Sequence, residues 1–140
     1  MVDLEALQTL VAAQRGKVVL LDFWATWCAP CVASLPELAV LQARYGPRGF
    51  QVIAVSFDDA DAWERKALPA LRRAGWTGPA VIARDRGAQN AIVAWLAEDW
   101  RSELPARYLF DREGGKAHEI LGADAADGAL AAERIGTLLP

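Results

Sequence analysis

The sequence predicts an α/β fold: a central mixed β-sheet flanked by helices on both faces, with a C-terminal β-hairpin followed by a last helix. Two apolar runs rich in β-branched residues, at 18–23 and 50–57, are typical of strands buried on both faces. Two shorter strands, at 108–110 and 118–121, enclose a glycine-containing turn, which indicates a hairpin. The chain has 140 residues and no internal repeat or linker, so we expect one domain over residues 1–140.

The first third of the chain predicts a helix, a strand and a second helix. Asp3 has the short carboxylate side chain that caps helix N-termini, and apolar residues recur beyond it at helical spacing as far as Gly16. The strand at 18–23 follows. A helix is expected over 31–45, and Pro36 inside it removes one backbone hydrogen bond and should kink it.

The middle of the chain predicts alternating strands and helices. After the strand at 50–57, Asp61 is expected to cap a helix that ends near Ala74. A short strand is expected at 79–83, followed by a polar turn and a helix over 88–101.

The segment 88–103 is rich in tryptophan. Trp95 and Trp100 stand five apart, which is not in helical register, so we expect one of them to be exposed. At the other end of the hairpin, Asp124 or Asp127 is expected to cap a last helix that ends near Leu139.

The only two cysteines of the chain stand three apart, in Trp27-Cys28-Ala29-Pro30-Cys31, directly after the first strand. A strand that leads into C-x-x-C at the start of a helix places the first sulfur where unpaired N–H groups and the helix dipole stabilise an anion. The thiolate is the nucleophile in disulfide exchange, so Cys28 is expected to be reactive near neutral pH. Cys31, one turn later, can close a disulfide and release a bound partner. The motif therefore predicts a thiol–disulfide exchange site.

Other uses of C-x-x-C fit the chain less well. A structural zinc site usually needs four ligands, and the chain offers two cysteines and one distant histidine. Haem attachment requires a histidine directly after the second cysteine, where Val32 stands. Two inert buried thiols remain an alternative, because free cysteines are commonly buried.

Composition excludes some classes of partner. The formal net charge of −3 gives no electrostatic reason to expect nucleic-acid binding or contact with an anionic membrane. No apolar run approaches the ~18 residues of a membrane helix, and the N-terminus has no visible signal peptide. Two cysteines do not identify the compartment, since a catalytic C-x-x-C works in oxidising and reducing ones.

Four stretches follow one another in the order of a known family. They are 19–31, then Pro36-Glu37-Leu38, then 52–56, and finally Leu104-Pro105 ahead of 108–114. In these stretches the chain resembles the TlpA/ResA-like thiol–disulfide oxidoreductases of the thioredoxin superfamily. The resemblance implies a thioredoxin fold. Two features depart from the family: Ala106-Arg107 follow the proline where Thr is common, and the segment 88–103 is longer.

The resemblance also implies roles for individual positions. Cys28 would be the exposed attacking cysteine and Cys31 the buried resolving one. Pro105 would be a cis-proline that faces the disulfide and leaves the Leu104 backbone free to pair with an extended substrate; an ordinary trans loop proline is the alternative. The residues expected to contact substrate surround these positions and are Trp27, Ala29, Pro30 and Leu104.

Asp22 interrupts an apolar strand, where an unpaired charge would cost on the order of several kcal/mol. The resemblance places here a buried carboxylate that accepts the proton of the resolving cysteine. A pKa raised by burial would suit such a general base. The alternative is an Asp paired with a nearby group such as Lys17. Glu37, which matches the Pro-Glu pair of the family, is expected to be a solvated helix charge.

We expect no metal and no bound cofactor, because the dithiol of Cys28 and Cys31 itself carries two electrons. His118 suggests a copper-carrying relative, but such carriers usually have three residues between their cysteines. The acidic cluster of Asp58, Asp59 and Asp61 precedes a predicted helix, so we interpret it as helix capping and dipole compensation rather than as a cation site.

The predicted function is reduction of disulfides in protein partners, with an upstream electron-donor protein that restores the dithiol. The pair Ala29-Pro30 is close to the reductase-type pairs of the family and lacks the histidine of strong oxidants. A disulfide oxidase or isomerase, a copper-binding module and a partner-docking module are the alternatives. A peroxidase is less favoured, because Ala25 stands where those enzymes have Thr.

The resemblance also predicts an extracytoplasmic, periplasmic location, with a signal or membrane anchor in a longer precursor. A cytoplasmic location stays open as the alternative. We expect a monomer that itself contacts neither membrane nor nucleic acid.

Overall fold

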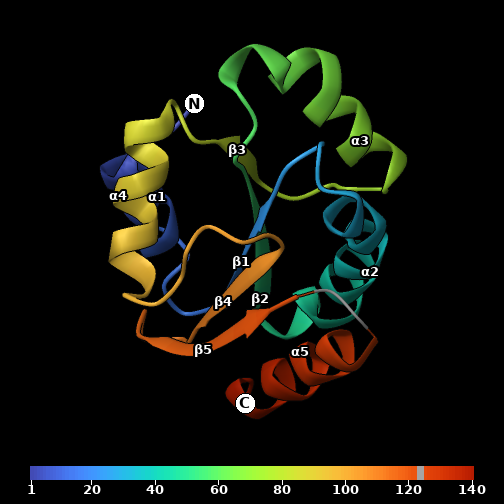
Figure 1. The fold of residues 1–140 in the computed structure, drawn as a ribbon. Coiled ribbons are helices and arrows are strands. Elements are labelled where there is room, and N and C mark those ends of the chain that lie inside the picture. The colour runs from blue at the N-terminus through green and yellow to red at the C-terminus, as the bar shows by residue number, and fades with distance from the viewer. Residues whose placement is uncertain (123–124) are drawn as a thin grey trace.

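Five strands form one mixed sheet at the centre of the molecule, with helices on both faces (Figure 1). The computed structural model describes residues 1–122 and 125–140. The strands are β1 (Val18–Trp24), β2 (Phe50–Ser56), β3 (Ala80–Ile82), β4 (Ala106–Phe110) and β5 (Lys116–Leu121), in the spatial order β3-β2-β1-β4-β5. β1, β2 and β3 are parallel, whereas β4 is antiparallel to both β1 and β5. The predicted central mixed sheet and C-terminal hairpin are thus confirmed.

The helices divide between the two faces of the sheet. They are α1 (Leu4–Ala12), α2 (Ala29–Tyr45), α3 (Leu68–Arg73), α4 (Arg86–Leu96) and α5 (Ala125–Leu138). α1 and α4 pack on one face, while α2 and α5 pack on the other, and α3 adjoins the start of α2 (Figure 1). Short 3-10 turns lie at Gly46–Arg48 and Ala60–Ala62, and a π-helical turn lies at Trp63–Ala67. None of the helices in the described ranges is long and apolar enough to cross a bilayer.

The central strand β1 is buried along its whole length. Its odd-numbered side chains from Val19 to Phe23 join the core under α1 and α4, while Val18 and Leu20 join the core under α2 and α5. Because side chains alternate along a strand, Asp22 lies on the face that α2 covers. Cys28 is the N-cap of α2 and Cys31 lies in its first turn, so Asp22 lies on the same side of the sheet as the two cysteines.

The helix predicted over 88–101 ends at Leu96 instead. The chain then turns away so that Trp100, only 2% exposed, can enter an aromatic cluster with Phe23, Phe57 and Tyr108. The indole Nε1 of Trp100 donates to the carbonyl oxygen of Glu103 at 3.0 Å. Burial of this indole outweighs the helical periodicity of the segment.

The expectation that Trp95 or Trp100 is exposed is also wrong. The Trp95 ring stacks on Phe110 at 5.7 Å between centroids. Both side chains therefore contribute to the packing on the α4 face of the sheet.

Helix ends confirm some predicted caps and correct others. The Asp3 carboxylate accepts from Ala6 N at 2.9 Å, as predicted, although α1 ends at Ala12 rather than at Gly16. Asp61 caps no helix: it lies inside the 3-10 turn, which has no side-chain cap. Pro69 has no N–H to donate to the preceding turn, so regular α-helical bonding begins only around it, in α3.

The remaining differences are small. α2 begins at Ala29, two residues before the predicted start. The predicted cap at Asp124 lies outside the described residues, and the side chain of Asp127 lies outside them as well.

Replacing Trp100 with alanine should lower the free energy of unfolding by about 3–5 kcal/mol, because the change empties the centre of the aromatic cluster. Urea denaturation of the oxidised protein measures this loss. Trp27→Ala is the matched control: its indole is 69% exposed, so the expected change is within about 0.5 kcal/mol. Equal losses for the two variants would contradict the buried role of Trp100.

Candidate active site

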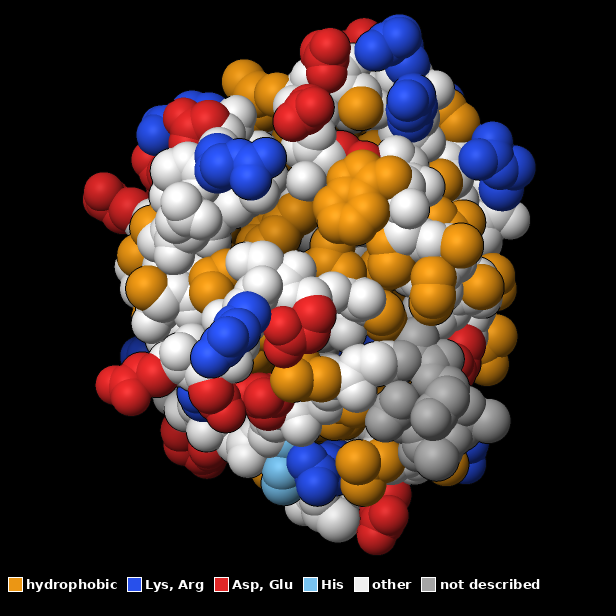
Figure 2. Space-filling view, viewed as in Figure 1, with side chains coloured by type: hydrophobic (Ala, Val, Ile, Leu, Met, Phe, Trp, Pro, Cys, Tyr) orange, Lys and Arg blue, Asp and Glu red, His pale blue; other side chains and the backbone are white. Residues whose placement is uncertain are grey.

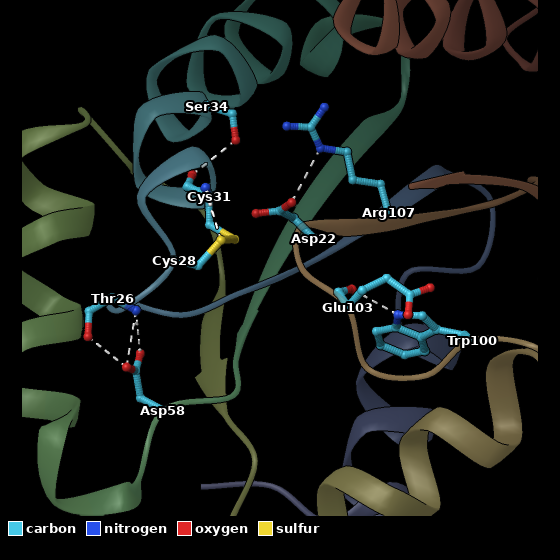
Figure 3. The surroundings of a disulfide bond; sticks show 9 residues. All are labelled: Asp22, Thr26, Cys28, Cys31, Ser34, Asp58, Trp100, Glu103 and Arg107. Carbon is cyan, nitrogen blue, oxygen red and sulfur yellow. Dashed lines mark hydrogen bonds and ion pairs between the residues drawn. A yellow bond between two sulfur atoms is a disulfide. The ribbon is translucent and has the colours of Figure 1, made fainter. Parts of the chain in front are cut away.

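Cys28 and Cys31 form a disulfide at the N-terminus of α2 (Figure 3). Cys28 is the N-cap of the helix, and its Sγ accepts a hydrogen bond from the backbone N–H of Cys31 at 3.3 Å. Cys28 is 7% exposed and Cys31 is fully buried. The alternative of two unconnected inert thiols is therefore wrong. Cys31 is buried as predicted, whereas Cys28, which was expected to be exposed, is also largely buried.

The loop ahead of Cys28 is fixed by Asp58, which follows β2. The Asp58 carboxylate accepts from Thr26 N at 3.1 Å and from Thr26 Oγ1 at 2.6 Å (Figure 3). Ser56 Oγ donates to its other oxygen at 2.6 Å, and Asp58 is only 2% exposed. The interpretation of Asp58 as a helix cap is thus wrong. Its carboxylate links the end of β2, through Ser56, to the turn at Thr26 that precedes the disulfide.

Trp27 protrudes beside the disulfide, with 69% of its side chain exposed. Ala29 and Pro30 are exposed on the same side of the helix start. Apolar side chains gather on this face of the molecule, over the end of β1 and the beginning of α2 (Figure 2). Trp27 separates two open grooves, one toward α3 and one toward Leu104. Trp27, Ala29 and Pro30 are thus accessible beside the disulfide, and their contact with substrate stays a prediction.

The peptide bond between Leu104 and Pro105 is cis, as the resemblance implies, and an ordinary trans proline is excluded. Pro105 is buried directly before β4. The half-buried Leu104 side chain packs against the apolar cluster that contains Cys28 and Cys31. Leu104 thus lies beside the disulfide, and Pro105 follows it in the chain; the contact of either residue with substrate stays a prediction.

Asp22 forms a buried ion pair with Arg107. The two residues stand opposite each other on β1 and β4, and Arg107 Nε donates to Asp22 Oδ1 at 3.3 Å. Burial raises the pKa of the Asp22 carboxyl from 3.8 to about 6, because the loss of hydration outweighs the attraction of Arg107. The other carboxyl oxygen points toward the disulfide (Figure 3). The partner of Asp22 is therefore Arg107 and not Lys17.

Arg107 was not predicted as a site residue. A signal for it was present, since Asp22 and Arg107 are the only charged residues in two otherwise apolar strands, 18–24 and 106–110. Opposite charges in two such strands suggest a cross-strand pair. Their pairing could not be assigned without the register between β1 and β4, which sets the two residues opposite each other.

The other candidate residues lie apart from the disulfide or on the surface. Glu37 is exposed on α2, and His118 stands on β5, paired with Leu109. Asp59 and Asp61 line the groove toward α3. Across residues 1–122 and 125–140, no three His, Cys, Asp or Glu side chains form a group that could hold a metal ion.

Comparison with known proteins gives consistent results. The model of the family described as Redoxin matches residues 3–138. The thiol-disulfide oxidoreductase ResA of Bacillus anthracis is 30% identical over 120 residues, which cover 86% of this chain and 64% of that protein. ResA of Geobacillus thermodenitrificans is 32% identical over 86% of this chain and 63% of its own length. The chain therefore spans somewhat less than two thirds of these relatives.

A solved structure from Chlorobium tepidum, assigned as a thiol:disulfide interchange protein DsbE, superposes with a TM-score of 0.75. It is 29% identical, and the match covers 91% of this chain and 84% of that one. A secreted disulfide oxidoreductase of Mycobacterium tuberculosis has the same fold, with a TM-score of 0.65, 18% identity and coverage of 91% and 86%. The observed sheet and helices are thus those of a thioredoxin fold.

The variant Asp22→Asn should show a pH-dependent difference in stability from the wild type. The folded carboxyl has a pKa of about 6, against 3.8 for the free group. Below pH ~4 it is protonated in both the folded and the unfolded state; between pH ~4 and ~6 the unfolded chain releases the proton first. Wild-type stability should therefore fall relative to Asp22→Asn by roughly 3 kcal/mol over this window.

Denaturant titrations of the two oxidised proteins between pH 4 and 7 measure this difference. Other ionisable groups are common to both proteins and cancel. A stability difference that is flat with pH, or that favours the wild type as the pH rises, would contradict the raised pKa.

Proposed function

The chain belongs to the Redoxin family, as a TlpA/ResA-like member of the thioredoxin superfamily, and from this we propose that it reduces disulfides in protein partners through Cys28 and Cys31. One observation carries the proposal: the two sulfurs are joined at a helix N-terminus, with one near the surface and the other buried next to Asp22. This arrangement gives the two cysteines different roles in exchange.

The first step uses Cys28. In the disulfide form its sulfur accepts the Cys31 N–H and lies at the positive end of α2. The same position favours the ionised form of Cys28 once the disulfide is reduced. The thiolate attacks one sulfur of a partner disulfide. A mixed disulfide forms between Cys28 and the partner, and the other partner sulfur leaves as a thiolate.

The second step uses Cys31 and Asp22. Cys31 loses its proton to the Asp22 carboxylate and attacks the Cys28 sulfur. The Cys28–Cys31 disulfide forms, and the mixed disulfide breaks as the second partner sulfur departs with the electron pair. The partner has gained two electrons, and a donor protein has to return two to the dithiol.

The residues between the cysteines favour the reducing direction. Pro30 has no N–H to donate, and Ala29 adds no positive charge near the sulfur. Among the described residues, the Cys28 sulfur accepts one hydrogen bond, from the Cys31 N–H. A strong oxidant requires a highly stabilised thiolate, because its reduced form has to be the stable one. The reverse direction, oxidation or isomerisation, is the alternative.

The partners are then protein disulfides and an electron-donor protein, and we expect a monomer. We place the protein outside the cytoplasm, in the periplasm, on the resemblance to the family alone.

Equilibration of the Cys28–Cys31 couple in defined thiol buffers tests the direction. We expect a reduction potential near that of thioredoxin, about −270 mV. A potential near −120 mV, the value typical of strong oxidants, would make the protein a disulfide donor. The absence of a reversible couple would refute the redox function.

Cys31→Ser should trap the partner, because the mixed disulfide on Cys28 has no thiol to resolve it. Incubation with a disulfide-bonded protein such as insulin, followed by non-reducing electrophoresis, should show a covalent adduct that thiols release. Cys28→Ser is the matched control and should form no such adduct. Equal adducts on both variants would contradict the assignment of Cys28 as the attacking cysteine.

A further inference from the structure

We propose that Arg107 is a positioning residue for the exchange reaction: its guanidinium holds the Asp22 carboxyl behind the disulfide and keeps it ionised, so that it can accept the Cys31 proton. The inference rests on the proposed function. It assigns a task to a residue that departs from the common pattern of the family, where Thr is usual in the stretch after the cis-proline.

The geometry fixes the carboxyl at one oxygen only. Arg107 Nε holds Asp22 Oδ1, whereas Oδ2 has no hydrogen-bond partner among the described residues and points toward the disulfide (Figure 3). Asp22 and Arg107 are 1% and 0% exposed, so neither water nor ions screen the pair. Arg107 thus orients the carboxyl and leaves its second oxygen available to a thiol proton.

Arg107 is also the only charged group that faces Asp22 within residues 1–122 and 125–140. The neighbour on β2 is Ala54, and the flanking residues on β1 are Leu21 and Phe23. On the α2 side, the titratable groups are the two cysteines of the disulfide. The next buried polar side chain along α2 is Ser34, whose hydroxyl donates to the carbonyl oxygen of Cys31. The charge of Arg107 and its hydrogen bond lower the pKa of this carboxyl, against the larger effect of burial, which raises it.

Such surroundings would keep a lone carboxyl protonated. Desolvation disfavours the charged form, and a fully buried acid without a cation titrates well above neutral pH. A protonated Asp22 cannot accept a proton. The positive charge of Arg107 opposes desolvation, and the resulting pKa of about 6 leaves most of the carboxyl ionised at pH 7.

The step that depends on Arg107 is the resolution of the mixed disulfide. As Cys31 attacks, its proton moves to Asp22 Oδ2, the Cys28–Cys31 bond forms, and the bond from Cys28 to the partner sulfur breaks. The attack of Cys28 on the first disulfide does not use this proton transfer. Arg107 should therefore affect the second step selectively.

The two steps can be followed separately with 5,5′-dithiobis(2-nitrobenzoate). Cys28 of the reduced protein attacks the reagent and releases the first nitrothiobenzoate, and Cys31 then releases the second. Stopped-flow absorbance between pH 4 and 10 gives a pH midpoint for each release. The variants are Arg107→Met, Arg107→Lys and, as a matched loss of an exposed positive charge at the far end of α2, Arg44→Met.

Loss of the charge in Arg107→Met should move the midpoint of the second release upward by about 1–3 pH units. Arg107→Lys should restore it in large part, and Arg44→Met should leave both midpoints where they are in the wild type. In an Asp22→Asn background, Arg107→Met should no longer shift the second release. An unchanged second midpoint in Arg107→Met, or the same shift in the Asp22→Asn background, would overturn the proposal.

A second measurement does not depend on the folding of Arg107→Met. The carboxyl carbon of Asp22 in the reduced wild-type protein can be titrated by carbon-13 NMR, with Asp22→Asn for assignment. A midpoint below pH 7 supports the role of Arg107, and a midpoint at or above pH 7 overturns it. If the wild type releases no second nitrothiobenzoate at all, the proposed function itself fails, which is a distinct result.

Discussion

Burial of β1 on both faces is the constraint on which the site depends. The strand lies between β2 and β4, and none of its residues reaches solvent to a significant extent. Alternation of its side chains directs Asp22 toward α2, and its register with β4 sets Arg107 opposite. The strand ends four residues before Cys28, so the disulfide is presented at its carboxyl end. One buried strand thereby positions the sulfurs, the acid and the cation.

The pair of Asp22 and Arg107 is a poor choice for stability alone. Removing two charges from water is costly, and a buried ion pair often contributes less than apolar residues of the same size would. Here the terminal nitrogens of Arg107 have no hydrogen-bond partner among the described residues, which adds to that cost. The pair lies next to the disulfide, and the proton transfer proposed above gives it a use that stability alone does not.

Much of the architecture could be predicted from local pattern. The buried strands, the Asp3 cap, the hairpin and the redox motif all depend on residues close in sequence. Some errors are local, such as the cap expected at Asp61, but the larger ones concern long-range contacts. Trp100 leaves its helix to complete an aromatic cluster, and Asp58 accepts from Thr26, 32 residues earlier in the chain. Arg107 was missed for the same reason, because only the register of β1 with β4 pairs it with Asp22. Periodicity and capping rules contain no information on such contacts.

The shallow exposure of Cys28 has a steric consequence. Only 7% of this residue is accessible, and Trp27 stands beside it with most of its indole in solvent. In the proposed first step, a partner disulfide has to pass the indole before its sulfur can contact Cys28. The S–S bond of the partner also has to point along the line of attack. For the exchange proposed above, this surface favours a partner disulfide that protrudes over one that is recessed.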